Sequence, residues 1–260
     1  MPYIAAHGCR LHYRLDGLER GPVLLFSNSL GCDSGMWDSQ VAVFSRTHRV
    51  LRCDTRGHGQ SEVPPGPYTL ESLGRDLVSL LDALQIERVH FCGLSLGGMV
   101  GMWLAVNAPN RLDRIVLANT SARLGPPEMW NDRISMVGAQ GMSAIADIVL
   151  QRWFTPSFRL AAPDAVEDCR RMLLGTSPEG YSSCCAVIRD MDQVEAVSRI
   201  ATPTLVVIGE HDPAAPPAHG QLIVSRIPHA AAVTLSAAHL SNIETAPAFN
   251  AAVAQFLAAS

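Results

Sequence analysis

Short runs of aliphatic and β-branched residues alternate with longer segments of helical periodicity along most of this 260-residue chain. The apolar runs have the length of strands that are buried on both faces of a sheet. Such alternation is typical of a mostly parallel sheet that is flanked by helices. The predicted strands are residues 23–27, 49–53, 89–92, 113–117, 203–208 and 231–235, and the predicted helices are residues 70–84, 96–107 and 246–258.

Two segments depart from this alternation. Residues 3–13 alternate polar and apolar side chains around His7-Gly8, which predicts an antiparallel hairpin at the start of the sheet. Residues 125–199 instead carry apolar side chains at helical spacing, together with loop signals, between two predicted strands. We therefore expect one α/β core formed by residues 1–124 and 200–260, with a helical cap inserted at residues 125–199.

The composition narrows the class of protein. A hydrophobic share of 48% with 17% charged residues is typical of a globular chain. The net charge of −4 does not favour binding to nucleic acid or to an acidic membrane surface. No apolar run approaches the ~20 residues that span a bilayer. The N-terminal residues show no export signal, and seven scattered cysteines suggest reduced, mostly buried thiols. The expectation is a cytoplasmic protein whose oligomeric state the sequence leaves open.

The strongest local motif is Gly93-Leu94-Ser95-Leu96-Gly97, which follows a predicted strand and opens a predicted helix. This arrangement is a nucleophile elbow, in which a strained turn lifts a serine hydroxyl out of the backbone. Glycines flank the serine because larger side chains would collide in so tight a turn. The helix that begins after Ser95 also points free N–H groups toward a developing oxyanion. A Gly-Ser turn without chemistry is the alternative interpretation.

A serine hydroxyl needs a histidine base, and the histidine needs an acid that orients it. After an elbow these partners follow in the order serine, acid, histidine, on loops at the carboxyl ends of later strands. Asp212 follows the predicted strand 203–208, and His239 follows the strand 231–235. The sequence therefore predicts Ser95, Asp212 and His239 as the catalytic residues.

Other polar residues near these loops are alternatives to this triad. Glu210 shares the loop of Asp212 and is an alternative acid. The loop after strand 113–117 could carry an acid in this type of fold, but Asn119 offers only an amide there. His58 and His211 are interpreted as braces of nearby loops. No group of histidines and carboxylates has the spacing of a metal site, so no metal is expected.

The oxyanion of an acyl-transfer reaction needs two backbone N–H donors. Leu96, directly after the nucleophile, should supply one of them. The other should come from the loop after strand 23–27, where Asn28-Ser29 occupy positions that carry His-Gly in many proteins with this elbow. Leu30 is then the second predicted donor, and an ordinary turn at this loop is the alternative.

The chain resembles the α/β-hydrolase superfamily, and within it the bacterial 3-oxoadipate enol-lactonases. The resemblance spans nearly the whole chain. The general motifs are the elbow and Asp54-Thr55-Arg56-Gly57-His58-Gly59-Gln60-Ser61. The more specific ones are Ser27-Asn28-Ser29-Leu30-Gly31, Pro65-Gly66-Pro67-Tyr68-Thr69, Gly209-Glu210-His211-Asp212-Pro213 and Ala237-Ala238-His239-Leu240-Ser241-Asn242-Ile243-Glu244.

The resemblance implies a cofactor-free serine hydrolase that opens the enol-lactone of 3-oxoadipate in the β-ketoadipate pathway of aromatic catabolism. Such a substrate carries a free carboxylate, which needs a cation or several donors when it is buried. The cap offers Arg133 and Arg152 for this charge, with Trp130 and Trp153 as walls. A general carboxylesterase, a perhydrolase or a C–C bond hydrolase with the same triad remains the alternative, and a non-catalytic receptor is a more distant one.

Overall fold

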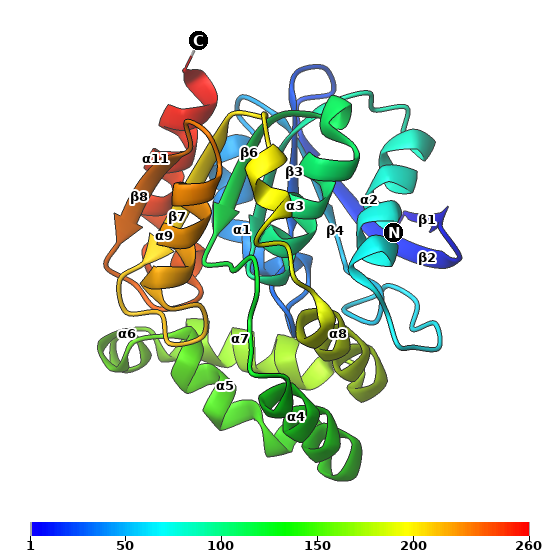
Figure 1. Cartoon of the computed structure of the whole chain (residues 1–260), viewed down its shortest axis with the longest axis vertical. Coiled ribbons are helices and arrows are strands. Elements are labelled where there is room, and N and C mark those ends of the chain that lie inside the picture. Colours follow the sequence, from blue (N-terminus) through cyan, green and yellow to red (C-terminus); the bar gives the residue numbers. More distant parts are fainter. Residues whose placement is uncertain (1, 260) are drawn as a thin grey trace.

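The computed structural model of the chain describes residues 2–259 and contains an eight-stranded sheet in the order β1-β2-β4-β3-β5-β6-β7-β8 (Figure 1). Strands β3 to β8 pair in parallel, and β1 and β2 add an antiparallel edge. The strands are β1 Tyr3–Ala6, β2 Cys9–Gly17, β3 Val23–Ser27, β4 Arg49–Cys53, β5 Val89–Leu94, β6 Leu112–Ala118, β7 Thr204–Gly209 and β8 Ala231–Leu235. The predicted mostly parallel sheet is confirmed.

The predicted strand bounds differ from the structure at a few ends only. Strand β5 continues two residues beyond the predicted 89–92, up to the residue before Ser95. Strand β6 is one residue longer at each end, and β7 begins and ends one residue later than expected. The hairpin turns at His7-Gly8 as predicted, but its second strand runs on to Gly17. It does so because β2 also pairs with β4, a contact that local alternation does not reveal.

Helices cover both faces of the sheet, with α1 packed against α11 and α2 packed against α3 (Figure 1). The three predicted helices correspond to α2 Leu70–Ala83, α3 Leu96–Asn107 and α11 Ala246–Ala258. The sequence patterns did not single out three others, which are α1 Asp38–Phe44, α9 Pro217–Arg226 and the short α10 Ser241–Glu244.

Five helices occupy the chain between β6 and β7 and lie together at one end of the sheet (Figure 1). Helix α4 packs against α8, and α5 packs against α7. These cap helices are α4 Pro127–Gln140, α5 Ala146–Trp153, α6 Pro156–Ala161, α7 Pro163–Gly175 and α8 Pro178–Asp190. They fall within the predicted insertion, whose boundaries at 125 and 199 remain a prediction.

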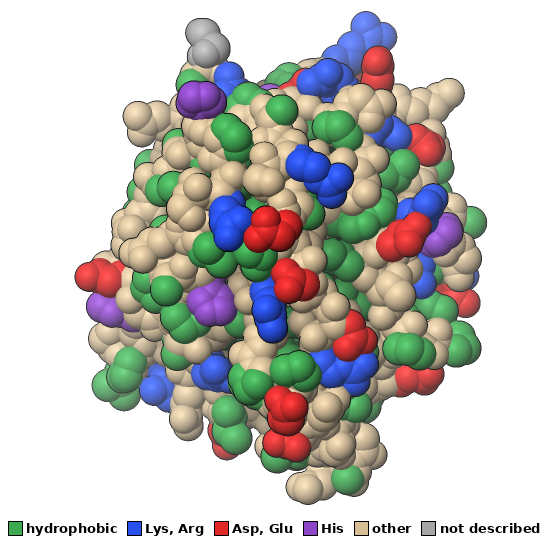
Figure 2. Space-filling model, in the orientation of Figure 1, with side chains coloured by type: hydrophobic (Ala, Val, Ile, Leu, Met, Phe, Trp, Pro, Cys, Tyr) green, Lys and Arg blue, Asp and Glu red, His purple; other side chains and the backbone are tan. Residues whose placement is uncertain are grey.

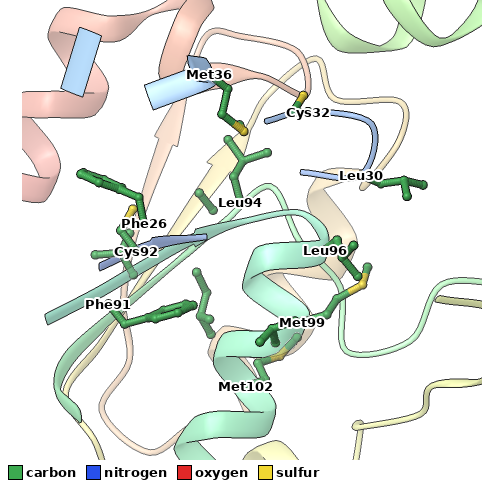
Figure 3. Packing of buried hydrophobic residues seen from close by; sticks show 14 of the residues in the cluster. Phe26, Leu30, Cys32, Met36, Phe91, Cys92, Leu94, Leu96, Met99 and Met102 are labelled. Carbon is green, nitrogen blue, oxygen red and sulfur yellow. The ribbon is translucent and has the colours of Figure 1, made fainter. Parts of the chain in front are cut away.

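A single large apolar cluster joins the sheet to its helices. Around the elbow, Figure 3 shows side chains of β3 and β5 packed with those of α3, among them Phe26, Phe91, Leu94 and Met99. All seven cysteines lie within the described residues, and each is buried and unpaired, as the sequence predicted. Burial raises the pKa of the Cys185 thiol to about 12, so this side chain behaves as a small apolar group.

The face of the molecule shown in Figure 2 has acidic and basic side chains interspersed, without a broad region of one charge. Along residues 2–259, none of the helices combines the length and hydrophobicity that a membrane crossing requires.

Candidate active site

Ser95 occupies a strained turn between β5 and α3. Its φ of 57° and ψ of −114° lie outside the regions that L-residues normally adopt. A Cβ on Gly93 would lie 2.3 Å from the Gly97 carbonyl oxygen, and one on Gly97 would lie 2.1 Å from the Ser27 carbonyl oxygen. Both flanking positions therefore require glycine, as the elbow motif predicted.

The loops after β7 and β8 bring Asp212 and His239 together. Asp212 Oδ2 lies 2.8 Å from His239 Nδ1, and both side chains are buried. His239 and Ser95 line the same cavity. Within residues 2–259 the Ser95 hydroxyl has no hydrogen-bond partner. In unliganded hydrolases the hydrogen bond between nucleophile and base is often long and shortens only when substrate binds. The structure thus brings the three predicted residues to one place.

The carboxylate of Asp212 is fully engaged in hydrogen bonds. Oδ1 accepts the N–H groups of Ala214 and Ala215 at 2.8 and 2.9 Å. Burial would raise the pKa of Asp212, but the charge and hydrogen bond of His239, together with the Ala215 N–H and the Asn119 amide, lower it below its usual value. Asp212 is therefore held ionised, which is the state that can orient and stabilise an imidazolium.

Glu210, the alternative acid, lies elsewhere. Its side chain is 57% exposed and sits 3.6 Å from the ring of His211, whereas the Asp212 side chain is 0% exposed. His211 Nε2 lies 3.2 Å from Ser236 Oγ, which agrees with its expected role as a loop brace. The geometry favours Asp212 over Glu210 as the acid.

Asn119 is the residue near the site that the sequence interpretation missed. Its amide Nδ2 donates to Asp212 Oδ2 at 3.0 Å and to the Ala238 carbonyl oxygen at 3.1 Å. The hydroxyl of Ser241 donates to Asn119 Oδ1 at 2.5 Å, which fixes the orientation of the amide. The sequence signal that could have indicated a role for Asn119 is its position directly after β6, where some proteins of this fold carry the catalytic acid. Here the amide supports an acid that comes from the next strand.

Two backbone N–H groups near Ser95 are the ones that the sequence predicts as oxyanion donors. Within residues 2–259, the N–H groups of Leu30 and Leu96 have no hydrogen-bond partner. The next N–H in the same loop, that of Gly31, donates to His58 Nε2 at 3.0 Å. Burial lowers the pKa of His58 to about 4, so this ring stays neutral and can accept that bond. His58 therefore braces the loop that carries Leu30, as expected from the sequence.

The cavity over Ser95 has a volume of about 50 Å³ and collects side chains from the core and from cap helices α4, α5 and α8. The four cap residues predicted from the sequence all line this cavity, and they are Trp130, Arg133, Arg152 and Trp153. Tyr181 and Ile188 of α8 line it as well. A larger cleft of about 560 Å³ lies between α7 and the loop at residues 33–39, but it is lined by several aspartates and by no member of the triad. The small cavity is therefore the candidate active site.

Two arginines of this cavity have no acidic partner. Within residues 2–259 neither Arg133 nor Arg152 forms an ion pair. The guanidinium carbon of Arg133 lies 5.1 Å from the centroid of the Trp130 ring. Arg152 Nη2 donates to the Pro213 carbonyl oxygen at 3.1 Å. Burial and then the nearby charge of Arg133 lower the pKa of Arg152. Two neighbouring, half-buried cations without a counterion make a favourable place for an anion.

Residues 22–246 match the family described as the alpha/beta hydrolase fold. The chain belongs to the α/β-hydrolase family. The match covers strands β3 to β8 and the cap helices between β6 and β7.

The relatives of the chain agree with the more specific resemblance seen in its motifs. It is 42% identical to 3-oxoadipate enol-lactonase 2 of Acinetobacter baylyi, over 96% of this chain and 94% of that protein. The identity to 3-oxoadipate enol-lactonase 1 of the same organism is 37%, over 91% and 89% of the two chains. Among solved structures, the enol-lactonase of Burkholderia xenovorans LB400 superimposes with a TM-score of 0.98 at 46% identity, covering 99% of this chain and 100% of that one. The resemblance to enol-lactonases is thereby confirmed.

Proposed function

We propose that this chain hydrolyses 3-oxoadipate enol-lactone to 3-oxoadipate in the β-ketoadipate pathway, with Ser95, His239 and Asp212 as nucleophile, base and acid. One observation carries the proposal. A single cavity holds Ser95 and His239 together with two arginines that form no ion pair within residues 2–259, and such a lining suits an ester-type substrate that bears a carboxylate. The chain's relatives among the enol-lactonases support the same substrate.

The reaction proceeds in two acyl-transfer steps. Ser95 attacks the lactone carbonyl while His239 takes its proton, and the N–H groups of Leu30 and Leu96 stabilise the oxyanion. The ring C–O bond then breaks, and His239 protonates the leaving enolate oxygen to an enol, which rearranges to the ketone. Water, deprotonated by His239, releases the acyl chain from Ser95. The leaving group is good, so the protein contributes mainly positioning and oxyanion stabilisation. These steps use the chain's own residues and one water molecule.

The cap residues supply recognition in this scheme. A carboxylate held between Arg133 and Arg152 would neutralise two charges that otherwise repel each other in a half-buried place. Trp130 and Trp153 are buried at the same cavity and provide apolar walls for the ring. We propose on this basis that residues 125–199 form a substrate-binding cap.

Replacing the arginine that binds the substrate carboxylate by methionine should weaken binding of the carboxylate without impairing the catalytic triad. We expect Arg133→Met or Arg152→Met to lower kcat/KM for the carboxylated lactone by about 10²-fold, the ~2–3 kcal/mol of a charge-assisted hydrogen bond. Hydrolysis of a small neutral ester should barely change in Arg133→Met, and should fall less than lactone turnover in Arg152→Met, which also loses its bond to the Pro213 carbonyl oxygen. Arg170→Met is the matched control, since Arg170 is a cap arginine that pairs with Asp147 and does not line the cavity. No loss in either variant, or equal loss on both substrates, would contradict the assignment.

Direct turnover of the enol-lactone, followed by the loss of its ultraviolet absorbance, tests the proposed activity. A panel of lactones and esters separates an enol-lactonase from a general carboxylesterase, a perhydrolase or a C–C bond hydrolase. Labelling by a fluorophosphonate separates any of these enzymes from a binding protein. We further infer a cytoplasmic location, which suits seven buried and unpaired thiols, and a small-molecule lactone as the partner rather than nucleic acid or membrane.

A further inference from the structure

The carboxylate of Glu244 connects the loop of His239 to the cap. Its Oε2 accepts the N–H of Ala238, the residue before His239, at 2.9 Å. Its Oε1 accepts the N–H of Thr155 at 3.3 Å and also the Thr155 hydroxyl. Thr155 lies two residues beyond the end of helix α5 and is the N-cap residue of α6 in the cap. A carboxylate from α10 thus joins two segments that are far apart in the sequence.

Two further contacts of the same cap segment reach the triad loops. The N–H of Leu240, the residue after His239, donates to the Trp153 carbonyl oxygen at 3.0 Å. Arg152 donates to the carbonyl oxygen of Pro213, the residue after Asp212, at 3.1 Å. Leu240 is therefore bonded directly to the end of α5, and Ala238 is linked through Glu244 to Thr155 just beyond it. Arg152 of α5 is bonded to the acid loop as well.

These contacts matter because His239 stands on a short loop between β8 and α10 and not on a regular element. A base must stay within a few tenths of an ångström of its working position, and a misplacement of 1 Å can cost about 10²-fold in rate. Asp212 fixes the ring through Nδ1, but it does not hold the backbone from which the ring projects. The neighbours of His239 have their N–H groups bound to Glu244 and to the cap.

We propose that Glu244 is a positioning residue for His239, and that it acts by holding the base loop against the end of α5. This proposal rests on the triad of the proposed function but not on the identity of the substrate. Because the base serves every acyl transfer, loss of Glu244 should slow all substrates alike. In this respect it differs from loss of an arginine that binds only the carboxylate.

The test compares Glu244→Ala with Glu244→Gln on a neutral chromogenic ester. We expect Glu244→Ala to lower kcat roughly 10-fold to 10²-fold with little change in KM, and to slow fluorophosphonate labelling of Ser95 in proportion. Glu244→Gln should recover most of this loss, because its amide oxygen can still accept the Ala238 N–H. Thr155→Val removes the hydroxyl contact with Glu244 from the cap side, together with the bond in which Thr155 Oγ1 accepts the Phe158 N–H at the start of α6. It should lower kcat a few-fold.

Glu62→Ala is the matched control. Glu62 also accepts a backbone N–H, that of Arg10 at 2.8 Å, and it lies outside the candidate active site. Its replacement should leave kcat unchanged. The proposal is overturned if Glu244→Ala keeps kcat within twofold of the wild type, or if KM alone changes. It is also overturned if Glu244→Gln is as slow as Glu244→Ala at equal thermal stability.

The outcomes also distinguish this proposal from the proposed function. Should Glu244→Ala unfold, the kcat of Thr155→Val decides, and an unchanged value overturns the proposal. A wild-type chain that hydrolyses the neutral ester but not the enol-lactone would refute the substrate while leaving the role of Glu244 testable by the same variants. A wild-type chain whose Ser95 is not labelled would refute the triad, and the positioning role with it.

Discussion

Replacement of Ser95 by alanine is expected to abolish turnover while the chain stays folded. The hydroxyl of Ser95 lines the cavity at the elbow, next to free N–H groups. Removing a member of a catalytic triad lowers kcat by roughly 10³-fold or more. Steady-state kinetics on the enol-lactone measures the loss, and the thermal midpoint reports on folding. A variant that kept a tenth of wild-type activity would show that Ser95 is not the nucleophile.

The chain supplies a matched control for this experiment. Ser121 is also buried, and its hydroxyl lies 2.6 Å from Nδ1 of His219. It resembles a nucleophile beside a base, but it does not line the cavity and is not on the elbow. We expect Ser121→Ala to retain activity and to be labelled by a fluorophosphonate as readily as the wild type. Labelling that depended on Ser121 would contradict the assignment.

Replacement of Asp212 by asparagine should cost about as much as the loss of Ser95. The amide would favour the wrong tautomer of His239, an effect of about 10⁴-fold in kcat in serine hydrolases. Glu210→Gln is the control in the same loop, and its exposed side chain predicts little change. A larger loss of kcat in the Glu210 variant would transfer the role of the acid to that residue.

The lowered pKa of Asp212 also makes stability depend on pH. A carboxylate whose pKa is lower in the folded than in the unfolded chain stabilises the fold above its unfolded pKa, about 4. That contribution is lost as the pH falls through the folded pKa. The free energy of unfolding of the wild type should therefore exceed that of Asp212→Asn at pH 7, and the difference should shrink below about pH 4. Denaturant unfolding at both pH values measures it, and a constant difference would contradict the assigned pKa direction.

Much of the fold could be predicted because the evidence for it is local in the sequence. A strand buried in a parallel sheet has a sequence that is a short apolar run. The elbow needs glycine on both sides of Ser95 for steric reasons. The same locality explains what was missed. The extension of β2 depends on pairing with β4, which is distant in the sequence.

The sequence by itself determined the order of strands along the chain, the elbow, and Asp212 and His239 as the polar residues that follow two late strands. These follow from periodicity and chain order, because parallel strands carry their loops to one edge of the sheet. Only the tertiary structure decided that Asn119 meets Asp212 across 93 positions, and that Glu244 meets Thr155 across 89. It also decided that Arg133 and Arg152 line one cavity and, among the residues that the structure describes, form no ion pair. Such pairings depend on how distant segments pack in space, and no local pattern of residues records that.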